Sequence, residues 1–178
     1  MRKRKSVRII AIALLCTLMI GAAIGIGVAA DDATGENVAT LGMRNLAYNA
    51  ELNLAVEVKQ VMEGDLGLGV WAADVAQPTE ENAIKITYEL NTTDFEGQTV
   101  CYAFSHGIAA KDIDTEYIFA AVVKDAEGVL HIGQTATYSV SDYLNTRLAE
   151  DITPEQETLY NAVIAYGAAA KDDLFGQK

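Results

Sequence analysis

The stretch TEYIFAAVVKDAEGVLHIGQTATYSV, residues 115–140, decides how this chain folds. Its first part, Thr115–Lys124, is apolar at both odd and even positions, which is typical of a strand buried on two faces. Asp125–Gly128 has the residues of a turn, and Val129–Val140 alternates apolar and polar residues. The stretch therefore predicts a hairpin at the centre of the protein. In its second strand we expect inward side chains at Leu130, Ile132, Ala136, Tyr138 and Val140.

Further segments with a period of two precede this hairpin, and turn signals separate them. The most regular alternation is that of Ile84–Leu90, whereas Asn91–Gln98 reads as a polar connection. With no long helical segment between the strands, a parallel α/β sheet is disfavoured and an antiparallel β-sandwich of about seven strands is predicted. Besides the hairpin, its strands are expected at Val38–Tyr48 (broken), Leu52–Lys59, Leu66–Ala72, Ile84–Leu90 and Val100–Ser105.

Beyond Val140 the apolar period changes from 2 to 3.6, which predicts a helical hairpin. Ser139 or Ser141 would cap the first helix, and Thr153 followed by Pro154 would start the second. We expect a sandwich over residues 38–140 and helices over 141–178 that pack on it or on a neighbouring domain. The second helix is predicted to bury a stripe made of Leu159, Val163, Tyr166, Ala170 and Leu174.

The first thirty residues predict export. Arg2–Arg8 is cationic, Ile9–Ala30 carries no charge, and small residues close the run. Signal cleavage would leave Asp31 at the N-terminus, followed by a short flexible linker to residue 37. Uncleaved, the apolar run is roughly 33 Å long as a helix and could anchor the chain in a membrane. In both cases the rest of the chain is expected outside the cytoplasmic membrane, secreted or at the cell surface.

Charge excludes several partners. Five of the 13 Lys and Arg residues lie in the N-terminal segment, so the rest of the chain sets 8 of them against 25 Asp and Glu, a formal charge of about −17. Nucleic acid and anionic lipid both demand a basic surface, so neither is an expected partner. Membrane contact is expected only through the N-terminal segment. The simplest interpretation of this charge is that it keeps the domain soluble, and the alternative is that it gives affinity for divalent cations.

The residues that nucleophilic catalysis needs are scarce. Cys16 lies in the export segment, so Cys101 has no partner for an intrachain disulfide and is expected to be an inert buried thiol. The two histidines are His106 and His131, the latter expected to be solvated. Five residues of extended strand separate Cys101 from His106 by roughly 16 Å, too far for a catalytic pair. With no nucleophile elbow and no zinc-binding spacing, we expect no catalytic residue, no cofactor and no enzyme activity.

An acidic turn precedes the hairpin, at Asp112, Asp114 and Glu116. It resembles the opening of a calcium loop, but Tyr117 stands where an EF-hand needs Gly and Val123 where it needs Glu. The turn is therefore no EF-hand, and the sequence assigns no metal ligand. A looser oxygen-ligand site for Ca²⁺ and a solvated charged turn both remain open.

Trp71 shares a strand face with Gly67 and Gly69, and strand glycines often lie beneath an aromatic ring. Its ring is expected to cover them. The alternative is an exposed platform for a sugar ring, with Tyr88 and Tyr102 as further ligand contacts.

Four segments of the chain resemble a known module. They are Ser105–Asp112, Tyr138–Leu144, Leu159–Val163 and Tyr166–Ala170. Their order resembles that of "YGIAAKD", "YSV.DY" and "YGAAAQ.YF" in a module of surface and secreted proteins from Gram-positive gut bacteria. Lys171 departs from the usual Gln, and residues 173–175 depart from the usual aromatic pair. The resemblance implies an extracellular Ig-like module, with no established activity and no catalytic residues.

These observations together predict a non-catalytic extracellular binding or structural module of a bacterial surface or secreted assembly. Its partner would be a surface protein or a glycan. The alternative is a carbohydrate-binding module that uses exposed aromatics such as Trp71.

Overall fold

The computed structural model describes residues 37–48, 51–95 and 97–175. The predicted export segment, residues 1–30, lies outside these ranges, as does the linker expected at 31–37 except for its last residue. In chain order the elements are β1 (Ala39–Tyr48), β2 (Leu52–Gln60), β3 (Asp65–Ala72), β4 (Lys85–Thr87), β5 (Asn91–Phe95), β6 (Gln98–Phe104), the 3-10 turn η1 (Ala110–Asp112), β7 (Tyr117–Lys124), β8 (Leu130–Tyr138), α1 (Val140–Leu148) and α2 (Pro154–Phe175).

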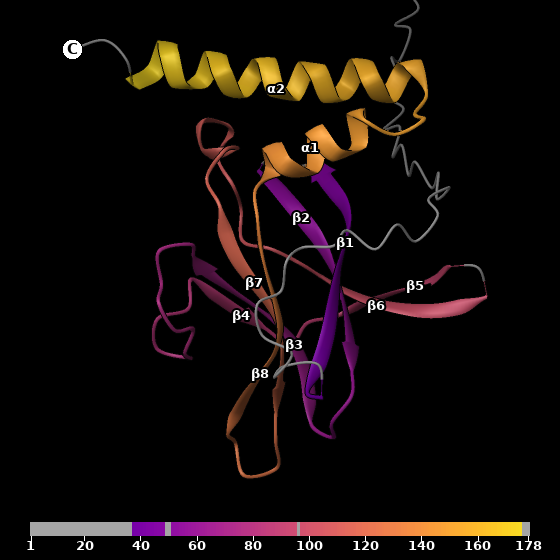
Figure 1. Cartoon of the computed structure of the whole chain (residues 1–178), viewed down its shortest axis with the longest axis vertical. Helices are drawn as coiled ribbons and strands as arrows, with labels where there is room; N and C mark the ends of the chain where they lie inside the picture. The colour runs from indigo at the N-terminus through magenta and orange to yellow at the C-terminus, as the bar shows by residue number, and fades with distance from the viewer. Residues whose placement is uncertain (1–36, 49–50, 96, 176–178) are drawn as a thin grey trace, which may run out of the picture.

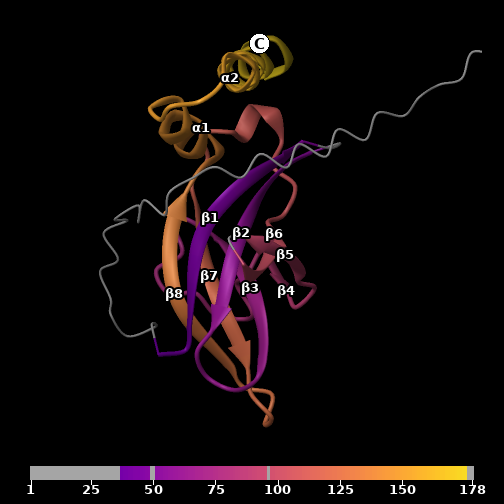
Figure 2. The ribbon, with the colours of Figure 1, turned by 90° about the vertical axis from the view of Figure 1, so that its right-hand side faces the viewer.

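Two four-stranded antiparallel sheets form the body of the protein (Figure 1 and Figure 2). The strand order is β1-β2-β6-β5 in the first sheet and β4-β3-β7-β8 in the second. This confirms a mainly β, antiparallel architecture with a helical tail. The described residues form eight strands, against about seven expected.

The main core lies between the two sheets. Alternate residues of β2, β3 and β7 point into it and are almost completely buried, as their period-2 patterns predict. Each Leu, Val or Phe side chain among them contributes roughly 1.5–3 kcal/mol through burial. These residues are Leu54, Val56, Val58, Leu68, Val70, Phe119, Ala121 and Val123.

β7 is buried on both faces, as its sequence predicts. Phe119 and Val123 belong to the core between the sheets, whereas Ala120 and Val122 pack with Trp71 on the outer face of the second sheet. Residues of the long β3–β4 connection pack against this smaller outer cluster. The two-sided burial of β7 therefore has two separate causes, a facing sheet and a covering loop.

A β-bulge interrupts the pairing of β7 with β8. Ala120 pairs with Thr135, but Val122 pairs with Ile132, so two residues of β8 stand opposite one of β7. Gly133 lies at this bulge. A Cβ there would come within 2.5 Å of a backbone oxygen of β1 and 2.8 Å of one of β7. Glycine thus lets the first strand pass close to β8.

The bulge corrects the expected faces of β8. Leu130 and Ile132 do not face the core between the sheets; they pack with Trp71 on the outer face. Tyr138, beyond the bulge, does lie in the main core. The prediction of one inward face for the whole strand is wrong, because an extra residue reverses the alternation of side chains.

The prediction for Ile84–Leu90 is also wrong in its extent. Only β4, a three-residue strand, forms there, and the expected polar connection after it contains β5. The chain crosses here from the second sheet to the first. Ile86 packs on the outer cluster, Leu90 packs against the main core, and Ile84 is 47% exposed. The apolar residues of this segment therefore lie in three different environments and do not form one face of a strand.

Both helices begin at the caps that the sequence predicts. Ser139 caps α1 in a capping box with Asp142. Thr153 caps α2: its hydroxyl accepts from the Gln156 amide at 3.3 Å, and its own amide donates to the Gln156 side chain at 3.0 Å. α2 lies across the end of the sandwich and contacts α1 and η1 (Figure 1). In the described ranges, no helix has the length and apolar character that a membrane crossing requires.

The buried stripe predicted for α2 is right in part. Ala170 is buried and Val163 packs against the main core, as predicted, whereas Leu159 is 44% and Tyr166 67% exposed. Tyr160 and Gly167, which lie outside the predicted stripe, are buried as well. The side chain of Leu174 lies outside the described part. The error arises because α2 is apolar around most of its circumference, so periodicity alone does not select the buried side.

Candidate functional site

An open cavity of about 580 Å³ lies where α1 begins. The end of β3, the loop between η1 and β7, and the N-terminus of α1 form its walls. Four carboxylates line it, and two of them come from the predicted acidic turn. They belong to Asp74, Asp114, Glu116 and Asp142.

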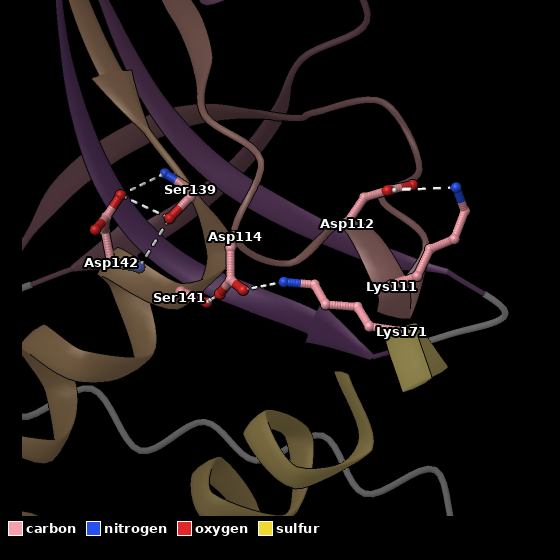
Figure 3. A network of polar contacts seen from close by, with 7 residues as sticks. All are labelled: Lys111, Asp112, Asp114, Ser139, Ser141, Asp142 and Lys171. Carbon is pink, nitrogen blue, oxygen red and sulfur yellow. Dashed lines mark hydrogen bonds and ion pairs between the residues drawn. The ribbon is translucent and has the colours of Figure 1, made fainter. Parts of the chain in front are cut away.

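Asp142 is occupied by the cap of α1 (Figure 3). Its Oδ2 accepts from the Ser139 amide at 2.9 Å and from the Ser139 hydroxyl at 2.6 Å. The Asp142 amide in turn donates to Ser139 Oγ at 3.0 Å. This carboxylate therefore stabilises the helix start, where the helix dipole also favours negative charge.

Asp114 joins three elements that are far apart in the sequence. Its carboxylate accepts hydrogen bonds from the Ser141 hydroxyl on α1 and from the Lys171 ammonium on α2 (Figure 3). The hydrogen bond from Lys171, followed by that from Ser141, lowers the pKa of the Asp114 carboxyl. Backbone contact supports the same junction, since the Ser141 amide donates to the Ile113 carbonyl at 2.9 Å. Asp114 thus fastens both helices to the loop before β7.

The calcium alternative gains no support from this geometry. Asp112 pairs with its neighbour Lys111 at 3.4 Å and does not line the cavity. Asp114 is held by Lys171, and Glu116 is exposed. Within the described ranges, no group of three or more His, Cys, Asp or Glu side chains is placed to hold a metal ion.

His106 lies half-buried at the end of β6, edge-on to Tyr117 with ring centroids 4.5 Å apart. Burial, followed by the nearby charge of Lys85, lowers the pKa of His106, while Glu51 opposes this shift. Its Nδ1 is buried and has no hydrogen-bond partner in the described part of the chain. Such a ring favours the neutral form and acts as an aromatic packing group. Cys101 is half-buried, so the prediction of a buried thiol is only partly met.

His131 is not a free, solvated histidine as predicted. Its Nε2 lies 2.7 Å from Asp125 Oδ2. Asp125 Oδ1 also accepts from the backbone amides of Glu127 at 3.0 Å and Val129 at 2.8 Å. The hydrogen bond with His131, followed by that with Val129, lowers the pKa of the Asp125 carboxyl. The pair therefore braces the turn of the β7–β8 hairpin.

Trp71 is completely buried, so the prediction of an exposed sugar platform at this residue is wrong. Its ring covers Gly69, as expected, because a Cβ there would lie 2.0 Å from Trp71 Cη2. The expectation that it also covers Gly67 is wrong, because the side chain nearest to that glycine is Tyr88. Its Nε1 donates to the Thr79 carbonyl at 2.8 Å. The sequence predicts a loop at Gln77–Asn82 but does not indicate that this loop covers Trp71, which is the reason for the burial.

The other two predicted contact residues lie apart from each other. Tyr88 covers Gly67 on the second sheet and is 37% exposed. Tyr102 lies on β6 in the first sheet, half-buried and edge-on to Phe104 with centroids 5.6 Å apart. Trp71, Tyr88 and Tyr102 therefore do not form one aromatic surface, and a ligand contact by either tyrosine stays a prediction.

Sequence reasoning missed the partners of Asp114, because Lys171 follows it by 57 positions. The one signal was that Lys171 departs from the pattern of the resembling module. Together, fold and site define a two-sheet antiparallel β protein whose acidic loop holds two C-terminal helices. Comparison with protein-family models, with curated proteins and with solved structures finds no match.

Proposed function

We propose that this protein is a non-catalytic module, a sandwich of Ig-like type that acts outside the cytoplasmic membrane in a bacterial surface or secreted assembly. The observation that carries the proposal is the Asp114 junction with Lys171 and Ser141. In the cavity at the start of α1, this carboxylate holds the two helices in place and is not held ready for chemistry. The end of the sandwich thereby becomes a fixed support for α2.

The N-terminal sequence supports the location. Cationic residues followed by the uncharged run Ile9–Ala30 have the composition of an export segment. A chain with 25 acidic residues and 8 basic ones outside that segment suits a soluble domain that avoids nucleic acid and anionic lipid. The ordered resemblance of Tyr138–Leu144 and Tyr166–Ala170 to a bacterial surface module points the same way.

Fractionation of the native cells, with mass-spectrometric analysis of the N-terminus, tests this proposal. We expect the chain outside the cytoplasm, beginning at Asp31. An intact Met1 in the membrane fraction would replace secretion by anchoring and keep the module outside. An intact chain in the cytoplasmic fraction would overturn the proposal.

A further inference from the structure

The outer face of α2 is apolar, and none of the residues that the structure describes covers it. This face consists of Leu159, Ala162, Ala165, Tyr166 and Ala169, all of them exposed. Tyr166, at 67%, is the most exposed of the large hydrophobic side chains in the described residues, and Leu159 is 44% exposed. The face lies beside the buried one, so that α2 is apolar around most of its circumference. A helix of this kind is normally covered on more than one side.

The protein cannot cover this face itself by rolling α2. Gly167 sits against the loop before β7 so closely that a Cβ there would lie 2.1 Å from Ile113 Cδ1. Lys171 is tied to Asp114 on the same side of the helix. Tyr160, at the other end of that side, packs edge-on to Tyr143 of α1 with ring centroids 6.4 Å apart. Rotation that buried Tyr166 would break all three contacts.

The rim of this face is acidic at both ends. Glu155 lies one helical turn before Leu159, and Asp172 lies one turn after Ala169; both are exposed. The one lysine of α2, Lys171, is paired with Asp114. A second copy of the chain would bring Glu155 towards the other copy's Asp172 end if the helices ran antiparallel. If the helices ran parallel, each acidic residue would face the same residue of the other copy. Both arrangements place like charges together, which is unfavourable across an interface.

We infer that the outer face of α2 is a docking surface for an amphipathic helix of another protein, apolar on one side and rich in Lys or Arg along its flanks. The alanines let the axis of a partner helix approach closely, and Leu159 and Tyr166 fill the spaces between its apolar side chains. Basic flanks would meet the acidic rim. This inference rests on the proposed role as a binding module and names the class of its partner.

Fluorescence anisotropy with synthetic peptides tests the inference on the purified full chain. The probe is a labelled amphipathic peptide of about five helical turns, with leucine on one face and lysine on the other. A second peptide has the same leucine face and glutamate in place of lysine. At about 0.15 M ionic strength, we expect the lysine peptide to bind and the glutamate peptide to bind at least tenfold more weakly.

Variants separate this face from general attraction to an acidic protein. Leu159→Ser combined with Tyr166→Ser should weaken binding of the lysine peptide at least tenfold, whereas Val61→Ser combined with Val129→Ser should leave it within twofold. The two valines are 55% and 53% exposed and lie outside α2. Ala162→Arg should also weaken binding, and Ala168→Arg, equal in charge on another side of α2, should change it much less.

Four outcomes would overturn the inference. The first is that the lysine peptide does not bind, and the second is that the variant with Leu159→Ser and Tyr166→Ser binds it as tightly as the wild-type protein does. The third is that the glutamate peptide binds as tightly as the lysine peptide. The fourth is self-association in sedimentation that Tyr166→Ser abolishes. The last would identify a second copy as the occupant. Because all substituted side chains are exposed, circular dichroism should show the wild-type fold in each variant. Each of these failures would leave the cellular location, tested by fractionation, unaffected.

Discussion

Gly69→Ala should destabilise the protein far more than a strand glycine normally would. An added Cβ would lie 2.0 Å from Trp71 Cη2 and 2.4 Å from Cζ3, although ordinary contacts begin at 3.4 Å. The indole would have to retreat by about 1.4 Å. Ala120 and Val122 pack against it in the outer cluster, and Nε1 is bonded to the loop above it. The ring therefore has little room to move.

The magnitude follows from the two ways in which the ring can respond. If it stays and its surroundings shift, overpacking costs about 1–3 kcal/mol. If it is expelled from its site, the loss approaches the roughly 3–5 kcal/mol of a buried Trp→Ala substitution. We expect Gly69→Ala to lower the free energy of unfolding by about 2–4 kcal/mol, equivalent to several degrees in Tm.

Urea denaturation followed by fluorescence measures this change directly, because Trp71 is the single tryptophan of the chain. The matched control is Gly42→Ala, also in a strand, where the nearest atom to an added Cβ is Glu57 Oε2 at 4.0 Å. Because alanine has less conformational entropy than glycine in the unfolded chain, that variant should be more stable by roughly 0.5 kcal/mol. If Gly69→Ala were as stable as Gly42→Ala, the packing of Trp71 on Gly69 would be refuted.

Three further results are expected. Ser139→Ala should lower the free energy of unfolding by about 1 kcal/mol, because α1 loses its cap. The control, Thr137→Ala at an exposed position, should lower it by less than about 0.5 kcal/mol. Equal values for the two variants in urea denaturation would contradict the role of Ser139 as a cap. Asp114→Asn should lower the free energy needed to detach α2 from the sandwich by less than about 1 kcal/mol, because the ion pair with Lys171 is exposed. Since the pKa of Asp114 is lowered by folding, its contribution is present above the unfolded carboxyl pKa and is lost as pH falls through the folded one. The measurement is hydrogen exchange of the α2 amides in the wild-type protein and in Asp114→Asn. If acidification changed the exchange rate by the same factor in both proteins, this role of Asp114 would be contradicted. His106 has a lowered pKa in the fold, so below about pH 6.5 the unfolded state takes up the proton first and stability falls. His106→Gln should flatten that part of the pH profile, and an unchanged slope would show that another group titrates.

Strong local patterns predicted the elements whose surroundings are simple. β2 has one side in the core, and alternation identified it. β7 has apolar residues on both faces, and both are buried. The caps at Ser139 and Thr153 were predicted because a cap is formed by residues within four positions of each other.

Elements that change surroundings part-way were not predicted correctly. In β8 the polar Gln134 interrupts the apolar positions, and the bulge lies at that point. The pattern carried the signal, but alternation on either side concealed the reversal of faces. In Ile84–Leu90 the alternation is regular, yet the segment crosses between sheets. Period-2 patterning reports which residues are buried and not which layer buries them.

The candidate site was predicted less well than the fold, because its contacts join distant parts of the chain. Asp114 was identified as one of several acidic residues, but nothing local indicated a lysine 57 positions later as its partner. Trp71 was correctly placed above Gly69, yet its exposure depended on a loop with no regular pattern. Pairings of this kind are set by topology, and one sequence does not reveal them.

The direction of β1 gives the molecule a polarity. This strand begins at Ala39, at the end of the sandwich away from α2, and runs towards the helices (Figure 1). Whatever precedes residue 37 therefore joins the body at the end of the sandwich opposite to α2, and the outer face of α2 lies at the other end.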